Sequence, residues 1–562
     1  MKQTSLSLTI CGALFLTACG SSKDENVPST VVQSEQTLTF GNATCWLGGT
    51  EKRSGIDKNN NAVLDDNEVE KTETICLSKN VFANGIRLDY EVMDNLKGIA
   101  DGAKAGNNLE VRRGGFGSDM VAHPSNKNQF YALTDRGPNA DYNLNKDNGK
   151  MFPDPTYVPR IGLFEVQGNG KVTKLKEILL KDRNGSNISG LPNANFGSTK
   201  EAAYDIYGKL LAKQSDEYGL DPEGLVALKD GTFWVSDEYG PHIIHYSAEG
   251  VELDRINAFE QDSRRTGGYL LPAEFANRRP NRGMEGLTIT PDGKTLVGIM
   301  QSTMDNPTSA VNKSDLTRIV TIDLATKKVK QYLYKQEGWA WAYSNSSITS
   351  LSNTSFLVLE RDGDFYKDNT QAFKRVYKID LRSATELESV TETAQFKQDA
   401  KLGLSIDGLT LEQYVLAKGW DGLKGLGILP ASKTLVLDMI EKVKFPHDKM
   451  EGLWLIDQQR LGLINDDDFS LWVTNGVLEQ KYLDKNKSVI DEKQVDELVI
   501  KFIKKHFFNC DENVDYKQLQ GNLKDYYRIR KSNIRLIIRV IDDNIIIEAI
   551  IEDIGYRGDI YK

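Results

Sequence analysis

The sequence is poor in cysteine and histidine, and it has no excess of positive charge. Five cysteines and five histidines in 562 residues are too few for a disulfide-rich scaffold or a histidine-built metal cage. Seventy Lys and Arg against 80 Asp and Glu leave a net charge of −10, which argues against general binding of nucleic acid. The zinc-protease helix, the nucleophile elbow and the phosphate-binding Walker loop are all missing from the sequence. These absences exclude several common enzyme designs.

The chain nevertheless has ample material for packed domains. Hydrophobic residues make up 39% of it, and its length suits two to four domains. Changes in composition divide it into a signal peptide, a flexible tether, a cysteine-bracketed segment, a large β-rich domain and a C-terminal segment. These parts span residues 1–19, 20–40, 41–80, 85–487 and 488–562.

The N-terminus has the features of an export signal. Lys2 precedes a mostly apolar stretch, Leu6–Leu16, that is too short to span a bilayer. The following Leu16-Thr17-Ala18-Cys19 resembles a bacterial lipobox, which implies cleavage before Cys19 and a lipid on that residue. We therefore expect an extracytoplasmic protein held at a membrane, and Gly20 favours the outer membrane of a Gram-negative host. An ordinary signal peptide is the alternative.

The cysteine-bracketed segment has the spacing of a calcium-binding loop. An oxidising compartment favours a disulfide between Cys45 and Cys76, which leaves Cys510 without a partner. Between them, oxygen ligands recur at the EF-hand positions, although Ala62 stands where that loop prefers glycine. A solvated acidic turn is the alternative. The expected Ca²⁺ ligands are Asp57, Asn59, Asn61, Val63, Asp65 and Glu68.

Between residues 85 and 487, one short pattern recurs five times. Each copy has an acidic residue, an apolar strand, a turn, a second apolar strand and a further polar or acidic end. Such repeats are typical of radial architectures, so we predict an all-β fold, a β-propeller of about six blades, with a β-sandwich as the alternative. The acids would then meet at the mouth of a central channel.

Several motifs in this region resemble one bacterial family. They include Leu220-Asp221-Pro222-Glu223-Gly224, Asn281-Arg282-Gly283-Met284-Glu285-Gly286, Leu359-Glu360-Arg361-Asp362-Gly363 and Met450-Glu451-Gly452. In this order they are similar to the phytase-like domain family named "esterase-like activity of phytase". The resemblance implies a propeller-like domain with esterase or phosphoesterase activity.

Clustered carboxylates are the candidate catalytic groups. They suit Ca²⁺, and one of them, with its pKa raised by its neighbours, could act as a general base. The candidates are Asp135, Asp221, Glu223, Asp237, Glu238, Glu285, Glu360, Asp362, Glu451 and Asp466. Adjacent arginines could bind the anionic group of a small substrate, namely Arg136, Arg282 and Arg361. The alternative is that these residues only form turns and neutralise one another.

The C-terminal segment has a different, α+β pattern. Helical spacing over Val489–Phe508 precedes strands at Tyr526–Arg530, Arg535–Val540 and Ile545–Ile551. This segment resembles part of the RelE/ParE toxin family, whose RNA-cleaving positions would correspond to Arg528, Arg530, Arg535, Arg557 and Tyr561. The family's first strand is missing, and an exported chain would not meet ribosomes. We therefore expect an inert tail and no nucleic-acid partner.

Two functions fit these observations. The first is a membrane-anchored hydrolase that attacks a phosphoester or ester at the channel mouth with the help of a metal ion. The second is a non-catalytic propeller that uses the same mouth to bind a ligand or a surface partner.

Overall fold

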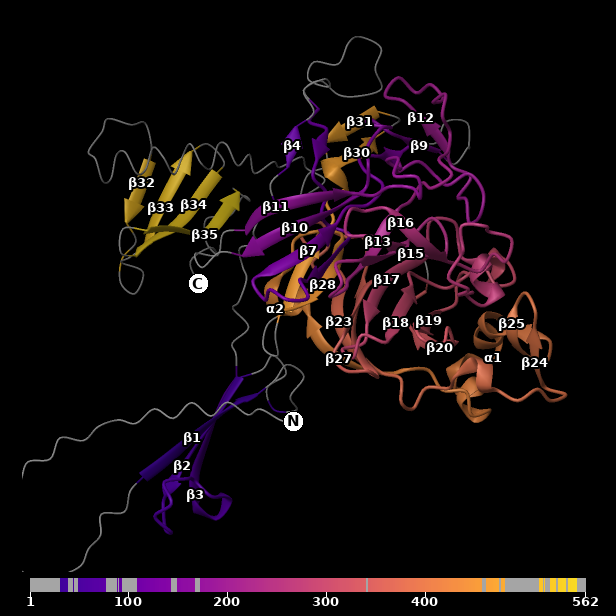
Figure 1. Ribbon diagram of the computed structural model, residues 1–562. Helices are drawn as coiled ribbons and strands as arrows, with labels where there is room; N and C mark the ends of the chain where they lie inside the picture. The colour runs from indigo at the N-terminus through magenta and orange to yellow at the C-terminus, as the bar shows by residue number, and fades with distance from the viewer. Residues whose placement is uncertain are drawn as a thin grey trace, which may run out of the picture.

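The computed structural model describes most of the large domain and parts of the segments on either side. The described residues are 31–38, 44, 49–76, 88, 90–92, 109–142, 149–166, 172–339, 342–456, 461–474, 477–480, 515–518, 520, 526–531, 534–541 and 544–552. Short strands dominate this part of the chain (Figure 1). None of the helices among these residues has the length and apolar character needed to cross a membrane. Cys19 and the signal peptide lie outside them.

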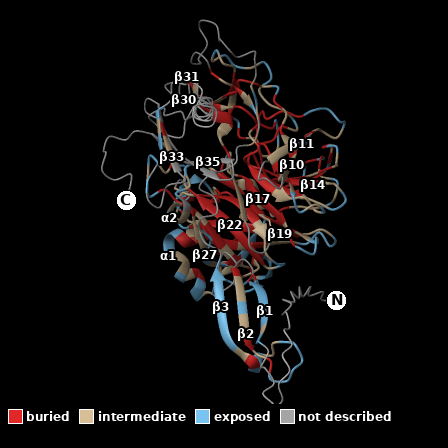
Figure 2. Ribbon diagram, turned by 90° about the vertical axis from the view of Figure 1, so that its left-hand side faces the viewer, coloured by how far each residue is buried: buried red, intermediate tan, exposed pale blue. Residues whose placement is uncertain are grey.

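An N-terminal antiparallel sheet consists of β1 (Val31–Leu38), β2 (Gly49–Ile56) and β3 (Val69–Cys76). The sequence placed residues 31–38 in the tether, and this boundary is wrong because β1 pairs with β2 along its whole length. The segment looked unstructured because it has few apolar side chains, but strand pairing with β2 satisfies its backbone. Figure 2 shows that β1 and β3 are largely exposed, whereas β2 between them is mostly half-buried.

The predicted calcium loop connects β2 to β3, so strands rather than long helices flank it. Its carboxylates accept hydrogen bonds from the loop's own amides: Ala62 donates to Asp57 at 2.8 Å and Lys58 donates to Glu68 at 2.8 Å. Ala62 has φ 61°, which explains why the loop family prefers glycine there. Cys76 is disulfide-bonded, while Cys45 lies outside the described residues. The pairing and the bound Ca²⁺ stay predictions.

Five antiparallel sheets form the large domain, and in each the chain runs outward from the first strand. The first sheet is β6 (Asp119–Ala122), β7 (Gln129–Leu133), β10 (Arg160–Val166) and β11 (Val172–Leu179). The second is β13 (Pro222–Ala227), β14 (Phe233–Asp237), β15 (His242–Tyr246) and β16 (Glu252–Ile256). The third is β17 (Met284–Ile289), β18 (Thr295–Met300), β19 (Leu316–Asp323) and β20 (Val329–Lys335). The fourth is β21 (Ser344–Ser350), β22 (Ser355–Arg361), β23 (Lys374–Asp380) and β27 (Ser432–Asp438), and the fifth is β28 (Met450–Leu455) and β29 (Leu461–Asn465).

The first strands of these sheets are neighbours in space. β6 contacts β13, β13 contacts β17, β17 contacts β21, β21 contacts β28, and β28 contacts β6. A separate apolar cluster fills the space between each pair of adjacent sheets, and these clusters make up the buried centre in Figure 2. The arrangement is mostly β and propeller-like, as predicted. The described residues contain five such sheets, against the six or so expected.

Glycine follows the acid in three of the five sheets, as Gly224, Gly286 and Gly452, and permits this close packing. A Cβ on Gly286 would lie 2.8 Å from the amide nitrogen of Ile348 in the next sheet, and one on Gly452 would lie 2.7 Å from that of Met120. The Glu-Gly pairs therefore belong to strands in which glycine lets the neighbouring backbone approach, and they do not form turns.

We expect Gly286→Ala to destabilise the protein by about 2 kcal/mol, because the extra methyl group meets backbone atoms that cannot move aside. Gly293→Ala is a matched control in the same sheet, since a Cβ there meets nothing within 4 Å, although its φ of 71° adds some backbone strain. Urea unfolding measures both variants. An unchanged midpoint for Gly286→Ala would contradict this explanation of the motif.

Smaller elements surround the five sheets. One helix and one three-stranded sheet cover the edge near β20: α1 (Leu411–Gly425) with β24 (Phe396–Asp399), β25 (Gly403–Ile406) and β26 (Leu409–Thr410). The others are β4 (Glu91–Val92), β5 (Arg112–Arg113), β8 (Ala140–Asp141), β9 (Gly149–Met151), β12 (Ala202–Tyr204), α2 (Met439–Val443), β30 (Leu471–Thr474) and β31 (Val477–Gln480). Single-turn 3₁₀ helices lie at Asp66–Glu68, Ala273–Asn277, Ser309–Val311, Leu387–Ser389 and Asp468–Ser470.

The C-terminal segment forms an antiparallel sheet of its own. It consists of β32 (Asp515–Gln518), β33 (Tyr526–Lys531), β34 (Ile534–Ile541) and β35 (Asn544–Glu552). The three predicted strands are confirmed, and β32 is an addition. The predicted helix, Arg557 and Tyr561 lie outside the described residues.

Candidate functional site

A backbone irregularity recurs at the same place in four of the five sheets. The register between the first and second strands shifts at Glu223, at Glu285, at Ser346 and at Glu451. A β-bulge redirects the side chain of the extra residue, and such bulges are common beside functional sites. Because the four strands surround one axis, three glutamates and one serine are brought to the same end of the ring.

In each of these sheets, the second strand ends beside the bulge of the first strand. Asp221, Glu223 and Glu238 are buried, and one carboxylate oxygen from each lies within 4.8 Å of the others. Glu451 and Glu285 are close enough to raise the pKa of Glu223. We call the five residues Asp221, Glu223, Glu238, Glu285 and Glu451 the axial acid cluster.

Arg136 neutralises one edge of the axial acid cluster. Its guanidinium lies 2.9 Å from Asp221 and 3.4 Å from Glu201, and its main-chain amide donates to Asp221 at 3.2 Å. Burial still raises the pKa of Asp221 to about 8, with further upward contributions from Glu238 and Asp237. Asp135 is adjacent, and burial raises its pKa as well.

Gln301, at the end of β18, links two members of the cluster. Its side-chain amide donates to Glu238 at 2.6 Å and to Glu285 at 2.9 Å. Its carbonyl oxygen accepts a hydrogen bond from Arg282. Burial raises the pKa of Glu285, and the carboxylates of Glu238 and Glu451 raise it further. An amide here holds two acids together without neutralising either.

Glu451 occupies the opposite edge with Arg361. Their side chains form a buried ion pair, and Arg361 also donates to Ser346 at 2.9 Å. Among the described residues, the second oxygen of Glu451 has no hydrogen-bond partner, and burial raises the pKa of this group to about 8. Beyond it, Asp466 accepts from Lys449 at 3.2 Å. Glu451 is therefore held at one oxygen and open at the other.

Glu223 differs from the rest of the cluster. Within the described part of the chain, no hydrogen bond or ion pair holds its carboxylate, which is 8% exposed. Burial raises its pKa, and the carboxylates of Glu451 and Glu285 raise it further. A divalent cation would remove this repulsion, and hard cations prefer such carboxylate oxygens. Asp221, Glu223 and Glu238 are therefore the residues that could supply part of the oxygen ligands of a divalent cation such as Ca²⁺.

Glu360 does not join the cluster, contrary to the sequence prediction. Its side chain lies on the other face of β22 from Arg361 and binds Lys433, the Tyr334 hydroxyl and the Glu337 amide. Successive strand residues face opposite sides, so Arg361 and Ser346 face the axis in this sheet instead.

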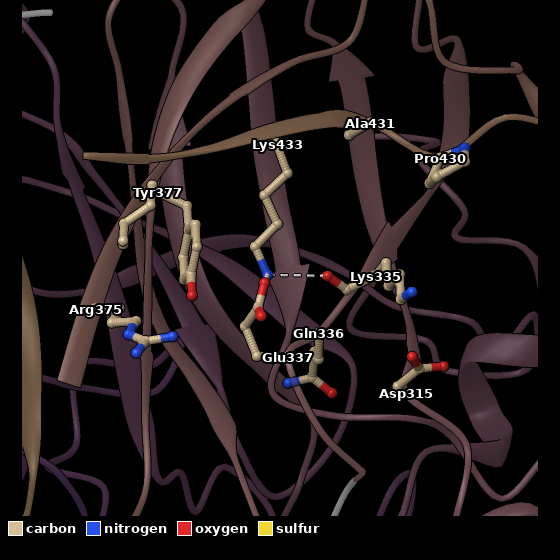
Figure 3. A pocket seen from close by; sticks show the side chains of 10 residues that line it. Asp315, Lys335, Gln336, Glu337, Arg375, Tyr377, Pro430, Ala431 and Lys433 are labelled. Carbon is tan, nitrogen blue, oxygen red and sulfur yellow. Dashed lines mark hydrogen bonds and ion pairs between the residues drawn. The ribbon is translucent and has the colours of Figure 1, made fainter. Parts of the chain in front are cut away.

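A surface pocket of about 680 Å³ lies beside Lys433. Figure 3 shows the ammonium group of Lys433 between Glu337 and the main-chain carbonyl of Lys335, at 2.8 and 3.1 Å respectively. The charged groups around Lys433 bind one another, so the pocket lacks the unsatisfied carboxylates that mark the cluster. The Gln336 side chain connects the two regions by donating to the main-chain carbonyl of Gln301 at 3.0 Å.

Two further predicted catalytic residues have structural partners. Asp237 accepts hydrogen bonds from the amides of Asp221, Tyr239 and Gly240. Asp362 binds the buried Lys374 ammonium and accepts from the Phe373 amide at 2.7 Å. Both stabilise the loops that follow their strands.

Sequence reasoning missed several residues of the site. Gln301, Glu201 and Arg279 were not among the candidates, although Gln301 occupies the same repeat position as Glu238. Asp119 was also missed: it accepts from Leu225 of the second sheet at 2.9 Å and from Ser347 of the fourth at 3.1 Å, and burial raises its pKa to about 8. Its place at the start of β6 in the repeated pattern was the available signal.

Comparisons with known proteins give a family and several distant likenesses. An uncharacterized secreted protein from Arthroderma benhamiae is 28% identical over 340 residues, which is 50% of this chain and 65% of that protein. The chain thus spans just under two thirds of that relative. The periplasmic gluconolactonase of Pseudomonas aeruginosa is 11% identical, with 54% of this chain and 86% of that chain covered and a TM-score of 0.24. The virginiamycin B lyase of Staphylococcus aureus is 12% identical, with 65% of this chain and 84% of that chain covered and a TM-score of 0.23. At these scores neither structure supports an argument about activity.

Family models match two parts of the chain. A domain of unknown function, DUF7151, matches residues 33–76, which include most of β1, all of β2 and β3, and the loop between β2 and β3. The phytase-like model, described as esterase-like activity of phytase, matches residues 112–469 and thereby confirms the likeness noted from the motifs. Because this match covers more than half of the chain, the protein belongs to the phytase-like family.

Proposed function

We propose that the protein is a hydrolase of esters or phosphoesters whose active site is the axial acid cluster with a bound Ca²⁺ ion. Two observations support this most. The side chains of Asp221, Glu223 and Glu238 are buried, and one carboxylate oxygen from each lies within 4.8 Å of the others. No described residue binds the Glu223 carboxylate. The family description agrees with this class of reaction.

The residues around the ion would have separate roles. Asp221, Glu223 and Glu238 would hold the cation, which when bound supplies positive charge to the ester oxygen and favours deprotonation of water. Arg136 and Gln301 orient Asp221 and Glu238 through the contacts described above. Glu451, with one oxygen open and the other paired to Arg361, is the proposed proton acceptor for the attacking water.

A non-catalytic propeller that binds a ligand at the same place is the second candidate. The near-complete burial of the cluster favours it, because a buried cation can serve structure alone. Turnover of a phosphomonoester, a phosphodiester and a carboxylester separates the two, measured with Ca²⁺ and with a chelator. We expect Ca²⁺-dependent hydrolysis of at least one probe. No turnover of any probe in Ca²⁺ would favour the binding protein.

We propose, in addition, that the protein is exported and anchored to the outer membrane by a lipid on Cys19. The secreted description of the Arthroderma benhamiae relative agrees with export. Intact-mass analysis of membrane fractions should show diacylglycerol and acyl groups on the wild type and none on Cys19→Ser. The RelE-like sheet β32 to β35 is proposed to be an inert tail.

A further inference from the structure

Asp119, the first residue of β6, has a buried side chain that reaches the first strands of three other sheets. One carboxylate oxygen accepts from the Leu225 amide of β13 at 2.9 Å, and the other accepts from the Ser347 hydroxyl of β21 at 3.1 Å. The amides of Leu453 in β28 and of Met120 in β6 itself donate to the same carboxylate. A single side chain is therefore bound by four of the five strands that surround the axis.

The strands around the axis need an acceptor of this kind. Among the described strands, β6, β13, β17, β21 and β28 each lie at the edge of their sheet, so one row of their backbone amides has no partner in a neighbouring strand. The two oxygens of a carboxylate offer about four acceptor positions, enough for every donor around Asp119. These hydrogen bonds lower the pKa of Asp119, against the larger effect of burial, because they stabilise the charged form.

The donors that bind Asp119 come directly after the bulges of the axial acid cluster. The Leu225 amide lies two residues after the bulge at Glu223. The Leu453 amide lies two residues after the bulge at Glu451, and the hydroxyl donor of β21 directly follows the bulge of that strand. Because the carboxylates of Glu223 and Glu451 repel each other, the strands that carry them need a link that holds them together.

We propose that Asp119 is a positioning residue of the axial acid cluster, because it links β13, β21 and β28 just past their bulges and so holds Glu223 and Glu451 close together against their repulsion. This inference rests on the proposed function, since it assigns Asp119 to the geometry of the proposed cation site. Asp119 would act through the backbone of these strands and would not itself bind the ion, because donors of the protein occupy both of its oxygens.

Calorimetric titration of Ca²⁺ into the full chain at pH 8 tests this role. Asp119→Asn keeps the size of the side chain but turns an amide nitrogen toward one of the donors. We expect it to weaken Ca²⁺ binding at the cluster at least about 10-fold and to leave the β2–β3 loop site unchanged. Ser347→Ala keeps the charge of Asp119 and removes one donor, so it should weaken the same site about 3-fold.

Asp254→Asn is the matched control. Asp254 is also a buried carboxylate, and it accepts from the amides of Thr266 and Gly267 at 2.7 and 2.9 Å and from the Thr266 hydroxyl at 3.1 Å. It lies on β16, the outermost strand of the second sheet. Asp254→Asn should therefore lower the melting temperature without changing the Ca²⁺ affinity of the cluster, which is the result expected of a purely structural acid.

Hydrogen exchange in chelator adds a measurement that needs no cation. Asp119→Asn should speed exchange in β13 and β28 at least about 10-fold relative to the outer strands of the same sheets, because the link between the two strands is lost. Asp254→Asn should instead speed exchange in β16.

Each outcome decides the proposal. Weaker cluster binding in Asp119→Asn and Ser347→Ala, with faster exchange in β13 and β28, supports the positioning role. Wild-type affinity in Asp119→Asn, or equal weakening in Asp254→Asn, overturns it. Weaker binding in Asp119→Asn with wild-type affinity in Ser347→Ala also overturns it, because the charge of Asp119 would then act without the link. If the wild type binds no Ca²⁺ at the cluster, the proposed function loses its ion, and unchanged exchange in β13 and β28 of Asp119→Asn would then overturn the positioning role as well.

Discussion

Replacing Glu223 with glutamine is expected to lower kcat/KM at least about 100-fold for any ester that the wild type hydrolyses. The substitution keeps the size of the side chain and removes the carboxylate that no described residue binds. Its neighbours Asp221 and Glu238 would then hold a cation with one charge less. Steady-state kinetics in saturating Ca²⁺ measures the effect.

The stability of Glu223→Gln distinguishes a functional role from a structural one. Removing one of several repelling carboxylates should leave the melting temperature in chelator equal to or above that of the wild type. Glu360→Gln is the matched control from the predicted set: it removes the buried one of the two carboxylates that bind Lys433 and should cost about 3 kcal/mol of stability while leaving kcat/KM unchanged. A loss of stability in Glu223→Gln together with a loss of kcat/KM in Glu360→Gln would show that the roles of the two acids were assigned the wrong way round.

A second large effect is expected when pH is changed without a cation. Burial raises the folded-state pKa of Asp119, Asp221 and Glu451 to about 8 and that of Asp237 to about 7, while the unfolded chain titrates near 4. Between these values the folded state holds protons that the unfolded state has lost. The contribution of these four groups to stability is therefore greatest below about pH 4 and falls as pH rises toward 8, by about 1.4 kcal/mol per pH unit for each proton.

Thermal unfolding in chelator should show this loss as a Tm lower by about 5 °C or more at pH 8 than at pH 6. Ca²⁺ should raise Tm more at pH 8 than at pH 6, because the ion binds the deprotonated carboxylates. A Tm that rises from pH 6 to pH 8 in chelator would contradict the buried, repelling state of the cluster.

The repeated strand pattern was enough to predict a propeller-like fold, because repeated pairs of apolar strands with polar ends are typical of radial architectures. The sequence did not show how the ring closes. Closure depends on contacts between β6 and β28, whose residues lie more than 300 positions apart. The role of glycine in Glu-Gly was also hidden, because it arises from the neighbouring sheet rather than from the local turn.

The site was predictable to the extent that its acids share a repeat position. Glu223, Glu285 and Glu451 follow one pattern, and the structure brings them together. The prediction that the Glu360 side chain faces the axis was wrong by one residue. Glu360 lies on the second strand of its sheet, and there the next residue, Arg361, faces the axis. A one-residue change reverses the face of a strand, and the sequence alone did not show the bulge at Ser346 that sets this register.

Calorimetric titration of Ca²⁺ into the wild type, Glu223→Gln and Glu68→Gln tests the central claim most directly. The account predicts that Glu223→Gln loses the cluster site and keeps binding at the β2–β3 loop, whereas Glu68→Gln loses the loop site and keeps the cluster site. Unchanged stoichiometry and affinity in Glu223→Gln would show that the axial acid cluster holds no calcium.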